Sequence, residues 1–190
     1  MEFQDDGRCP VRNLVSQTVT PFSVLVAYED FATGNHALTM FQRLFPEGGG
    51  LSRFTTQNVW KFDLLEIAKS QEMAAEEAAG ADMIILSLHG KSGLPRAVKR
   101  WMDTWVLKRK YDTGALVVLM DSTKRERGIA GIQMETYLQT CAFRAEMDLF
   151  LEGVTDESFA GGKITADEEN LPAPSFRKIL PLFGRGSARN

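Results

Sequence analysis

The chain has 190 residues, of which 44% are hydrophobic and 25% are charged, and its formal net charge is −3. This is the composition of an ordinary globular domain with a sizeable core. The small negative charge excludes a general attraction to nucleic acid or to an anionic membrane surface. The longest apolar runs, such as residues 83–86, are too short to span a bilayer. The acidic, polar start of the chain is not typical of a secretory signal.

Two cysteines, Cys9 and Cys141, and two histidines, His36 and His89, are the residues that would carry disulfide or zinc chemistry. The cysteines are far apart and have no CxxC spacing, which predicts reduced thiols in a cytoplasmic protein. The four residues do not have the spacing of a zinc motif, so we predict no zinc site.

Short apolar runs alternate with amphipathic stretches along the middle of the chain. Residues 1–20 have no periodicity and are expected to form an arm, residues 21–153 one domain, and residues 154–190 a C-terminal tail. The predicted strands are residues 23–28, 53–62, 81–87, 115–120 and 146–151. The predicted helices are residues 33–45, 69–79, 95–110 and 129–145.

This alternation predicts a three-layer α/β fold with a five-stranded parallel sheet in the order 2-1-3-4-5. Prolines in the tail oppose a fifth helix there, although residues 176–183 are apolar enough to dock on the domain.

Trp60 and Phe62 fall on a predicted edge strand and are interpreted as a cover for that edge or as a homodimer contact.

The helical periodicity also predicts which side chains are buried. The start of the second helix is ambiguous, because Asp63 with Glu66 suits a capping box while Ser70 is an alternative cap. The third helix is expected to bury Ala97, Val98, Trp101, Met102, Trp105 and Val106. The fourth is expected to turn Ile132, Tyr137, Leu138, Cys141 and Ala142 inward.

Ligands of open α/β sheets bind outside the carboxyl ends of the strands. Three loops lie there, residues 29–37, 89–95 and 121–128, and they offer a helix N-terminus, hydroxyl groups and cations that suit phosphate oxygens. The residues predicted to bind an anionic small molecule are Thr33, Gly34, Asn35, His89, Gly90, Lys91, Ser92, Ser122, Thr123, Lys124 and Arg125.

Other interpretations of these residues remain open. Thr33 to Asn35 also suit an ordinary helix start with Asn35 as the N-cap. The cations suit a solvated surface balanced by acidic neighbours. His36 and His89, with Glu29 or Asp30, would share a metal or a proton, or else act as ordinary hydrogen-bonded loop residues.

Two parts of the chain resemble flavin proteins. Tyr28 followed by Thr33-Gly34-Asn35 is similar to the phosphate-binding loop of flavodoxins, and residues 81–105 (ADMIILSLHGKSGLPRAVKRWMDTW) resemble part of the NADPH-dependent FMN reductases. The resemblance implies a flavodoxin-like fold, FMN as cofactor and a flavin-dependent NAD(P)H oxidoreductase. The chain departs from that pattern in having no aromatic residue in 89–94 or 121–128, and in placing Glu29 and Asp30 beside the expected phosphate.

The chain is also similar to receiver domains of two-component signalling, which share this strand order. Glu29-Asp30 corresponds to their acidic pair, and Ser122 or Thr123 to their hydroxyl residue after the fourth strand. Their phosphoacceptor aspartate is replaced by residues 88–90 (LHG), and their lysine after the fifth strand by residues 152–153 (EG). The alternative function is therefore a non-catalytic, receiver-like interaction module.

Overall fold

The computed structural model describes residues 21–46, 55–111, 113–121, 124–153 and 176–179. Five parallel strands lie in the order β2-β1-β3-β4-β5, as the sequence predicts, and a sixth strand pairs antiparallel with β5. The strands are β1 (Phe22–Tyr28), β2 (Thr55–Lys61), β3 (Met83–Leu88), β4 (Ala115–Met120), β5 (Asp148–Gly153) and β6 (Phe176–Ile179). The helices are α1 (Phe31–Leu44), the 3-10 helix η2 (Phe62–Glu66), α2 (Ala68–Ala79), α3 (Arg96–Lys108) and α4 (Lys124–Arg144).

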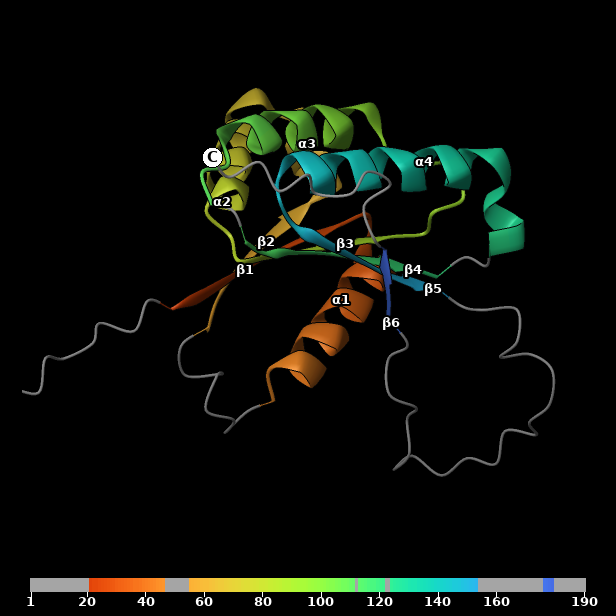
Figure 1. Cartoon of the computed structure of the whole chain (residues 1–190), viewed down its shortest axis with the longest axis horizontal. Coiled ribbons are helices and arrows are strands. Elements are labelled where there is room, and N and C mark those ends of the chain that lie inside the picture. The colour runs from red at the N-terminus through yellow and green to blue at the C-terminus, as the bar shows by residue number, and fades with distance from the viewer. Residues whose placement is uncertain (1–20, 47–54, 112, 122–123, 154–175, 180–190) are drawn as a thin grey trace, which may run out of the picture.

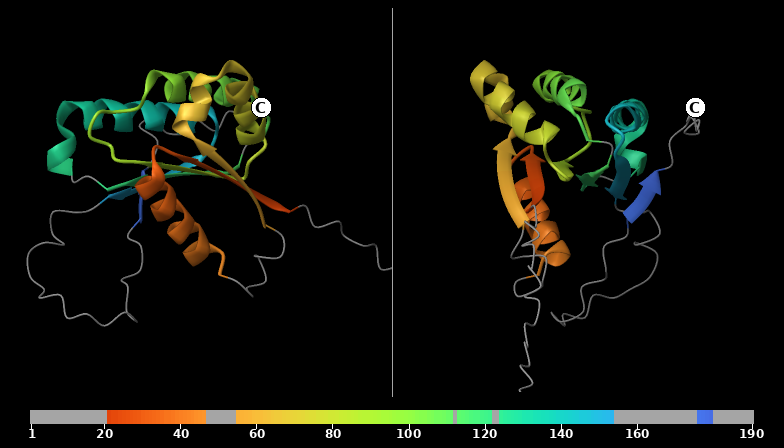
Figure 2. Two further views of the ribbon diagram at one scale, coloured as in Figure 1. Left: turned by 180° about the vertical axis from the view of Figure 1, so that it is seen from behind. Right: turned by 60° about the vertical axis from the view of Figure 1, so that its left-hand side comes forward.

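The two faces of the sheet are covered unequally (Figures 1 and 2). Helices α2, α3 and α4 lie in a row on one face, and α1 alone lies on the other. The described part of the tail contributes β6 at the edge of the sheet, which the sequence pattern does not predict. Within the described ranges, no helix combines the length and the apolar character needed to cross a membrane.

Helix α3 buries the face that its periodicity predicts. All six expected residues are buried, and Trp101 and Trp105 are fully enclosed with their ring centroids 6.3 Å apart. At the end of α3, Arg109 donates from Nη1 to the carbonyl of Ala81 at 2.8 Å, which ties the helix end to the chain entering β3. The packing of α3 against the sheet is therefore a main part of the core.

The start of α2 differs from both sequence interpretations. The chain first forms η2, and Ile67 then occupies the N-cap of α2 with no side-chain cap. Neither Asp63 nor Ser70 caps the helix. Phe62 is buried in the core and so does not form a surface contact, while the indole of Trp60 donates to Glu77 at 2.7 Å. A buried phenylalanine that begins a 3-10 turn explains the difference, because packing overrides the local capping preference.

Helix α4 consists of two helical segments separated by a kink at Gly128, which has a φ of 53°, and the longer segment begins at Ile129, as the sequence predicts. Leu138, Cys141 and Ala142 are buried as expected. Ile132 was expected to point inward, but its side chain is 68% exposed, so that prediction is wrong. The buried stripe of α4 passes through Met134 and Leu138 instead, because a helix in contact with one sheet buries only one side.

We expect Trp101→Ala to lower the free energy of unfolding by about 3–5 kcal/mol, because the substitution leaves a cavity in a fully packed site. Leu107→Ala is the matched control, since Leu107 lies on the same helix and is 74% exposed. The control should change stability by less than about 0.5 kcal/mol. Chemical denaturation measures both values, and equal effects for the two variants would contradict the packing described.

Candidate functional site at the carboxyl edge

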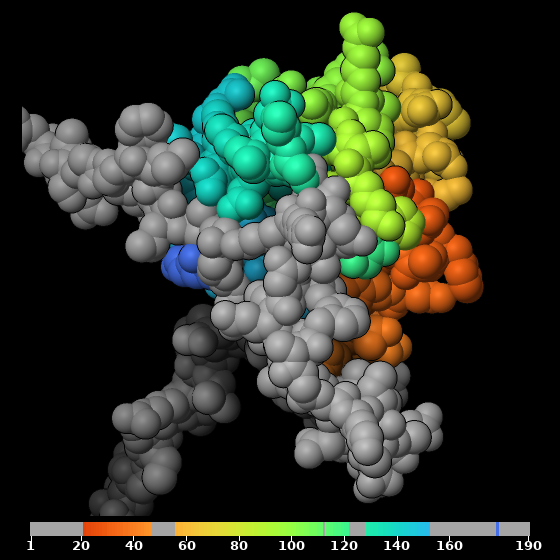
Figure 3. Space-filling model, turned by 90° about the vertical axis from the view of Figure 1, so that its right-hand side faces the viewer, coloured from red at the N-terminus to blue at the C-terminus, as the bar shows by residue number. Residues whose placement is uncertain are grey.

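The register of the parallel strands brings three loops together. The amide of Glu29 donates to the carbonyl of Ser87 at 3.0 Å, which extends the β1–β3 ladder beyond the last paired residues. Leu88 and Met120 are the last pair of β3 and β4, so His89 and Asp121 leave the sheet side by side. Figure 3 shows the segments that follow β1, β3 and β4, in orange-red, lime and green, meeting on one face.

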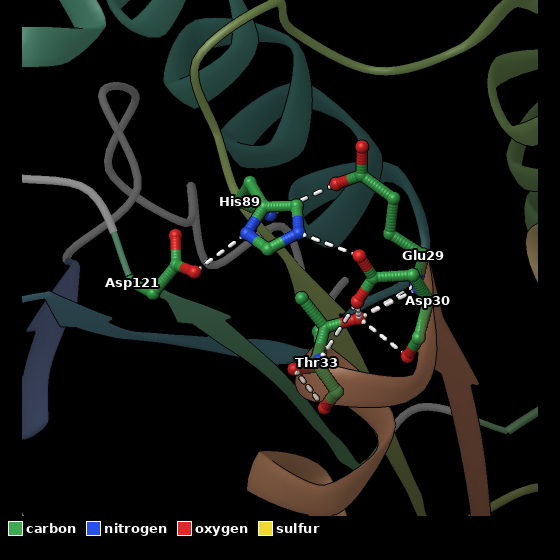
Figure 4. Close-up of polar contacts among 6 residues, drawn as sticks. Glu29, Asp30, Thr33, His89 and Asp121 are labelled. Atoms are coloured by element: carbon green, nitrogen blue, oxygen red, sulfur yellow. Dashed lines mark hydrogen bonds and ion pairs between the residues drawn. The ribbon is translucent and has the colours of Figure 1, made fainter.

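The imidazole of His89 lies between two carboxylates (Figure 4). Its Nε2 is 2.8 Å from Oδ2 of Asp30, and its Nδ1 is 2.5 Å from Oδ2 of Asp121. An ionised carboxylate only accepts hydrogen bonds, so both ring nitrogens must carry a proton to satisfy both contacts. The arrangement therefore requires an imidazolium, and we refer to Asp30, His89 and Asp121 as the clasp.

The electrostatics of the clasp agree with its geometry. Hydrogen bonding to Asp30 and then to Asp121 raises the pKa of His89 to about 9. The backbone N–H of Thr33, followed by His89, lowers the pKa of Asp30 to about 2. Glu29 adds a further link, because its Oε2 accepts the backbone N–H of His89 at 2.8 Å. At neutral pH one fixed cation thus lies among three carboxyl side chains.

Asp30 is also the N-cap of α1. Its Oδ1 accepts the amide of Thr33 at 3.0 Å, and the hydroxyl of Thr33 accepts the amide of Asp30 at 2.8 Å, which completes a capping box. The expectation of Asn35 as the N-cap is wrong, because α1 begins at Phe31. Beneath the cap, the buried hydroxyl of Ser87 donates to the carbonyl of Thr33 at 2.8 Å and joins β3 to the first turn.

The first turn of α1 does not fit a phosphate cradle in this arrangement. The amide of Thr33 is engaged by Asp30, and the amide of Gly34 donates to the carbonyl of Asp30 within the helix at 2.8 Å. A Cβ on Gly34 would lie 2.9 Å from the ring of Tyr28, so this glycine allows close packing under the tyrosine. Asn35 is exposed. The residues at this helix start therefore do not fit the phosphate of FMN, which would face the carboxylates of Glu29 and Asp30.

The other predicted binding residues divide into four groups. Gly90 is buried with a φ of 77°, which a glycine adopts without strain, and it turns the chain directly after His89. Lys91 and Ser92 are exposed in the same loop. Lys124 and Arg125 form the first residues of α4, and Ser122 and Thr123 lie outside the described residues.

The two histidines have separate partners. Nε2 of His36 is 3.4 Å from Oε2 of Glu152, and this contact raises the pKa of His36. His89 instead faces Asp30 and Asp121, so of the interpretation that joined both histidines to Glu29 or Asp30 only the contact between His89 and Asp30 is present. In the part of the chain that the structure describes, no group of three or more His, Cys, Asp or Glu residues could hold a metal ion.

The sequence analysis did not assign Asp121 to the site, and it considered Glu29 and Asp30 as obstacles to an anion, as partners of the histidines and as a receiver-like acidic pair, but not as two parts of an ion pair with Asp121. The signal that could have found the clasp is the register, because Asp30, His89 and Asp121 each lie within two residues of the end of a neighbouring strand. An isolated histidine among acidic strand ends suits an ion pair at least as well as a ligand.

Comparisons with known proteins give no relative from which to transfer a function. No model of a known protein family matches the chain, and no curated protein matches it significantly in sequence.

The clasp should make stability depend on pH in the alkaline range. The folded pKa of His89, about 9, lies above its ordinary value of 6.5, so its stabilisation is complete below pH 6.5 and is lost as the pH rises through 9. Solvent screens this surface site, so we expect a loss of about 1–2 kcal/mol rather than the full linkage value.

His89→Gln tests this expectation. Between pH 6 and pH 9.5, the unfolding free energy of the wild type should fall more than that of the variant. The difference between the two losses should be about 1–2 kcal/mol. Lys91→Gln is the matched control, because Lys91 is an exposed cation of the same loop, and it should retain the wild-type pH dependence. Denaturation curves at each pH provide the measurement, and parallel profiles for wild type and His89→Gln would disprove the clasp.

Proposed function

We propose that this domain is a non-catalytic interaction module of receiver-like design, in which an internal ion-pair clasp holds the carboxyl edge in one fixed state. The observation that supports the proposal is the position of His89, whose two ring nitrogens face Asp30 and Asp121. In open α/β folds, ligands bind outside the carboxyl ends of the strands, which is where the clasp lies. Here its acidic groups are paired with a cation of the chain itself.

The contacts of the clasp leave its groups poorly suited to chemistry at neutral pH. A general base or a metal ligand needs a free imidazole nitrogen, and His89 has both nitrogens engaged with carboxylates. Asp30 is held as helix cap and ion-pair partner, and its lowered pKa of about 2 makes it a weak base. These features favour a structural role for the clasp over a catalytic one.

The comparison with receiver domains supports the same proposal. His89 follows β3 at the place where a receiver has its phosphoacceptor aspartate, and Glu152-Gly153 stands where a receiver has lysine. Aspartyl phosphorylation needs that carboxylate as nucleophile. We therefore propose that partner binding by this domain is not switched by phosphoryl transfer. The free, buried thiol of Cys141 is compatible with the proposed cytoplasmic location.

A second proposal is that this edge binds an anionic ligand, such as FMN or another nucleotide. The corresponding activity would be that of a flavin-dependent NAD(P)H oxidoreductase. The exposed Lys91 and Ser92 favour it, because a cation and a hydroxyl beside a strand end suit phosphate oxygens. The capped start of α1 opposes it. The anion would have to bind at the loop after β3 and not at α1.

Calorimetric titration separates the two proposals. FMN, ATP and inorganic phosphate should each bind more weakly than about 1 mM, with and without magnesium, because the acidic groups repel anions. Acetyl phosphate with magnesium should leave the intact mass of the protein unchanged. Tighter binding of FMN that Lys91→Ala weakens and Lys99→Ala does not would support the second proposal and overturn the first. A stable phosphoprotein would also overturn it.

A further inference from the structure

A cavity of about 130 Å³ lies at the amino edge of the sheet, where the parallel strands begin, and so at the opposite end from the clasp. It is lined by residues 109–111, which follow α3, and by residues 144–146, where α4 ends. The amide of Asp148 donates to the carbonyl of Gly114 at 2.9 Å, which holds the starts of β4 and β5 side by side. This pairing brings the two segments together, and we call the space between them the amino-edge cavity.

Positive charge dominates the lining of the amino-edge cavity. Arg109, Lys110 and Arg144 are cations, and Glu146 is the one carboxylate among the lining residues that the structure describes. The C-terminal ends of α3 and α4 each add about half a negative charge, so together with Glu146 they offset about two of the three positive charges. In the described part of the chain, no carboxylate forms an ion pair with any of these cations. About one positive charge thus remains for a ligand.

Arg109 is fixed in the wall of the cavity, and its side chain does not cap α3. Its Nη1 donates to the carbonyl of Ala81 at 2.8 Å and its Nη2 to the carbonyl of Thr113 at 2.5 Å, and both acceptors lie outside the helix. Gly114 leaves room for this guanidinium, since a Cβ there would clash with Nη2. Burial lowers the pKa of Arg109, because neutral carbonyls only partly replace water around its charge. A bound anion would complete the compensation of a cation that is already held in place.

Glu146 has a backbone conformation that favours glycine. Its φ is 54°, in the left-handed region that a glycine usually occupies after a helix. The amides of Glu146 and Met147 donate to the carbonyls of Phe143 and Ala142 at 3.2 and 2.9 Å, which closes the end of α4. A glutamate that occupies this position despite the backbone strain points to a role for its side chain. A second negative charge on a ligand would be repelled by this carboxylate, so the lining favours a carboxylate ligand over a phosphate dianion.

The size of the cavity suits the end of a side chain better than a whole cofactor. Pockets for drug-sized ligands measure about 300–1,000 Å³, whereas a cavity of 130 Å³ has room for about four water molecules or the end of a glutamate side chain. Apolar side chains are exposed at the same end of the molecule. Tyr111 of the lining is 62% exposed, and Leu107 and Phe143, in the last turns of α3 and α4, are 74% and 46% exposed. A ligand that enters the cavity with one acidic group can therefore also make apolar contacts outside it.

We propose that the amino-edge cavity binds one carboxylate of an acidic peptide segment of a partner protein, with an apolar residue of that peptide against Tyr111. This inference rests on the proposed function, because it names the kind of partner that the interaction module takes. A single ion pair at a protein surface contributes little free energy. Free phosphate, which makes only the ionic contact, should therefore bind weakly, whereas a peptide that combines both kinds of contact should bind more tightly.

Calorimetric titration of the full chain with the peptide acetyl-SGLEELEGS-amide tests the proposal. The dissociation constant should be about 0.1 mM or lower, at least tenfold below that of inorganic phosphate. The analogue with glutamine in place of each glutamate should bind about tenfold more weakly or not at all. Arg144→Gln should weaken binding of the acidic peptide by about tenfold, because a charge-assisted hydrogen bond is lost. Arg100→Gln is the matched control, since it removes the same charge from an exposed position about two turns before the end of α3, and it should leave the affinity unchanged.

Glu146→Gln guards against a trivial loss of folding, because removal of the opposing carboxylate should tighten the binding of both the acidic peptide and phosphate by about tenfold. Backbone amide shifts in NMR spectra should locate the peptide at residues 107–111 and 143–147. The proposal would be overturned by an acidic peptide that does not bind, by equal losses in Arg144→Gln and Arg100→Gln, or by shifts at residues 29–31 and 89–91 instead. Wild-type protein that binds phosphate as tightly as the peptide would also contradict it. FMN binding and phosphorylation are not measured here, so this proposal and the proposed function can fail separately.

Discussion

The arrangement of the loops at the carboxyl edge of this sheet depends on one cation, the imidazolium of His89, which lies among acidic residues that follow the strands. Parallel pairing in this register places Glu29, Asp30 and Asp121 in the two loops that flank the loop after β3, where their charges would repel one another. The imidazolium of His89 relieves that repulsion by contacting Asp30 at 2.8 Å and Asp121 at 2.5 Å. These two contacts thereby hold the loops after β1, β3 and β4 together.

Asp30 connects this clasp to the body of the domain. The same carboxyl group caps α1 through Thr33 and pairs with His89, while Ser87 holds the first turn of α1 against β3 from below. The helix N-terminus, which serves as an anion site in many α/β proteins, is therefore stabilised by an internal carboxylate.

The fold was predictable from sequence because a strand buried on both faces is a continuous apolar run and α3 has a single regular apolar stripe. The same reasoning placed Trp101 and Trp105 correctly. It failed for Ile132, because α4 has two apolar sides and periodicity alone does not say which one meets the sheet. The clasp was missed for a different reason, since His89 and Asp121 are 32 positions apart and become neighbours only through strand register.

The protonation state of His89 tests the central claim most directly. Nitrogen-15 NMR of the wild type at pH 7.5 should show both ring nitrogens of His89 protonated, because its pKa is raised to about 9. His89 in an Asp30→Asn/Asp121→Asn variant should instead be neutral at that pH, with one protonated nitrogen, since the ordinary pKa of histidine is about 6.5. A neutral imidazole in the wild type at pH 7.5 would show that His89 is not the cation that closes this edge.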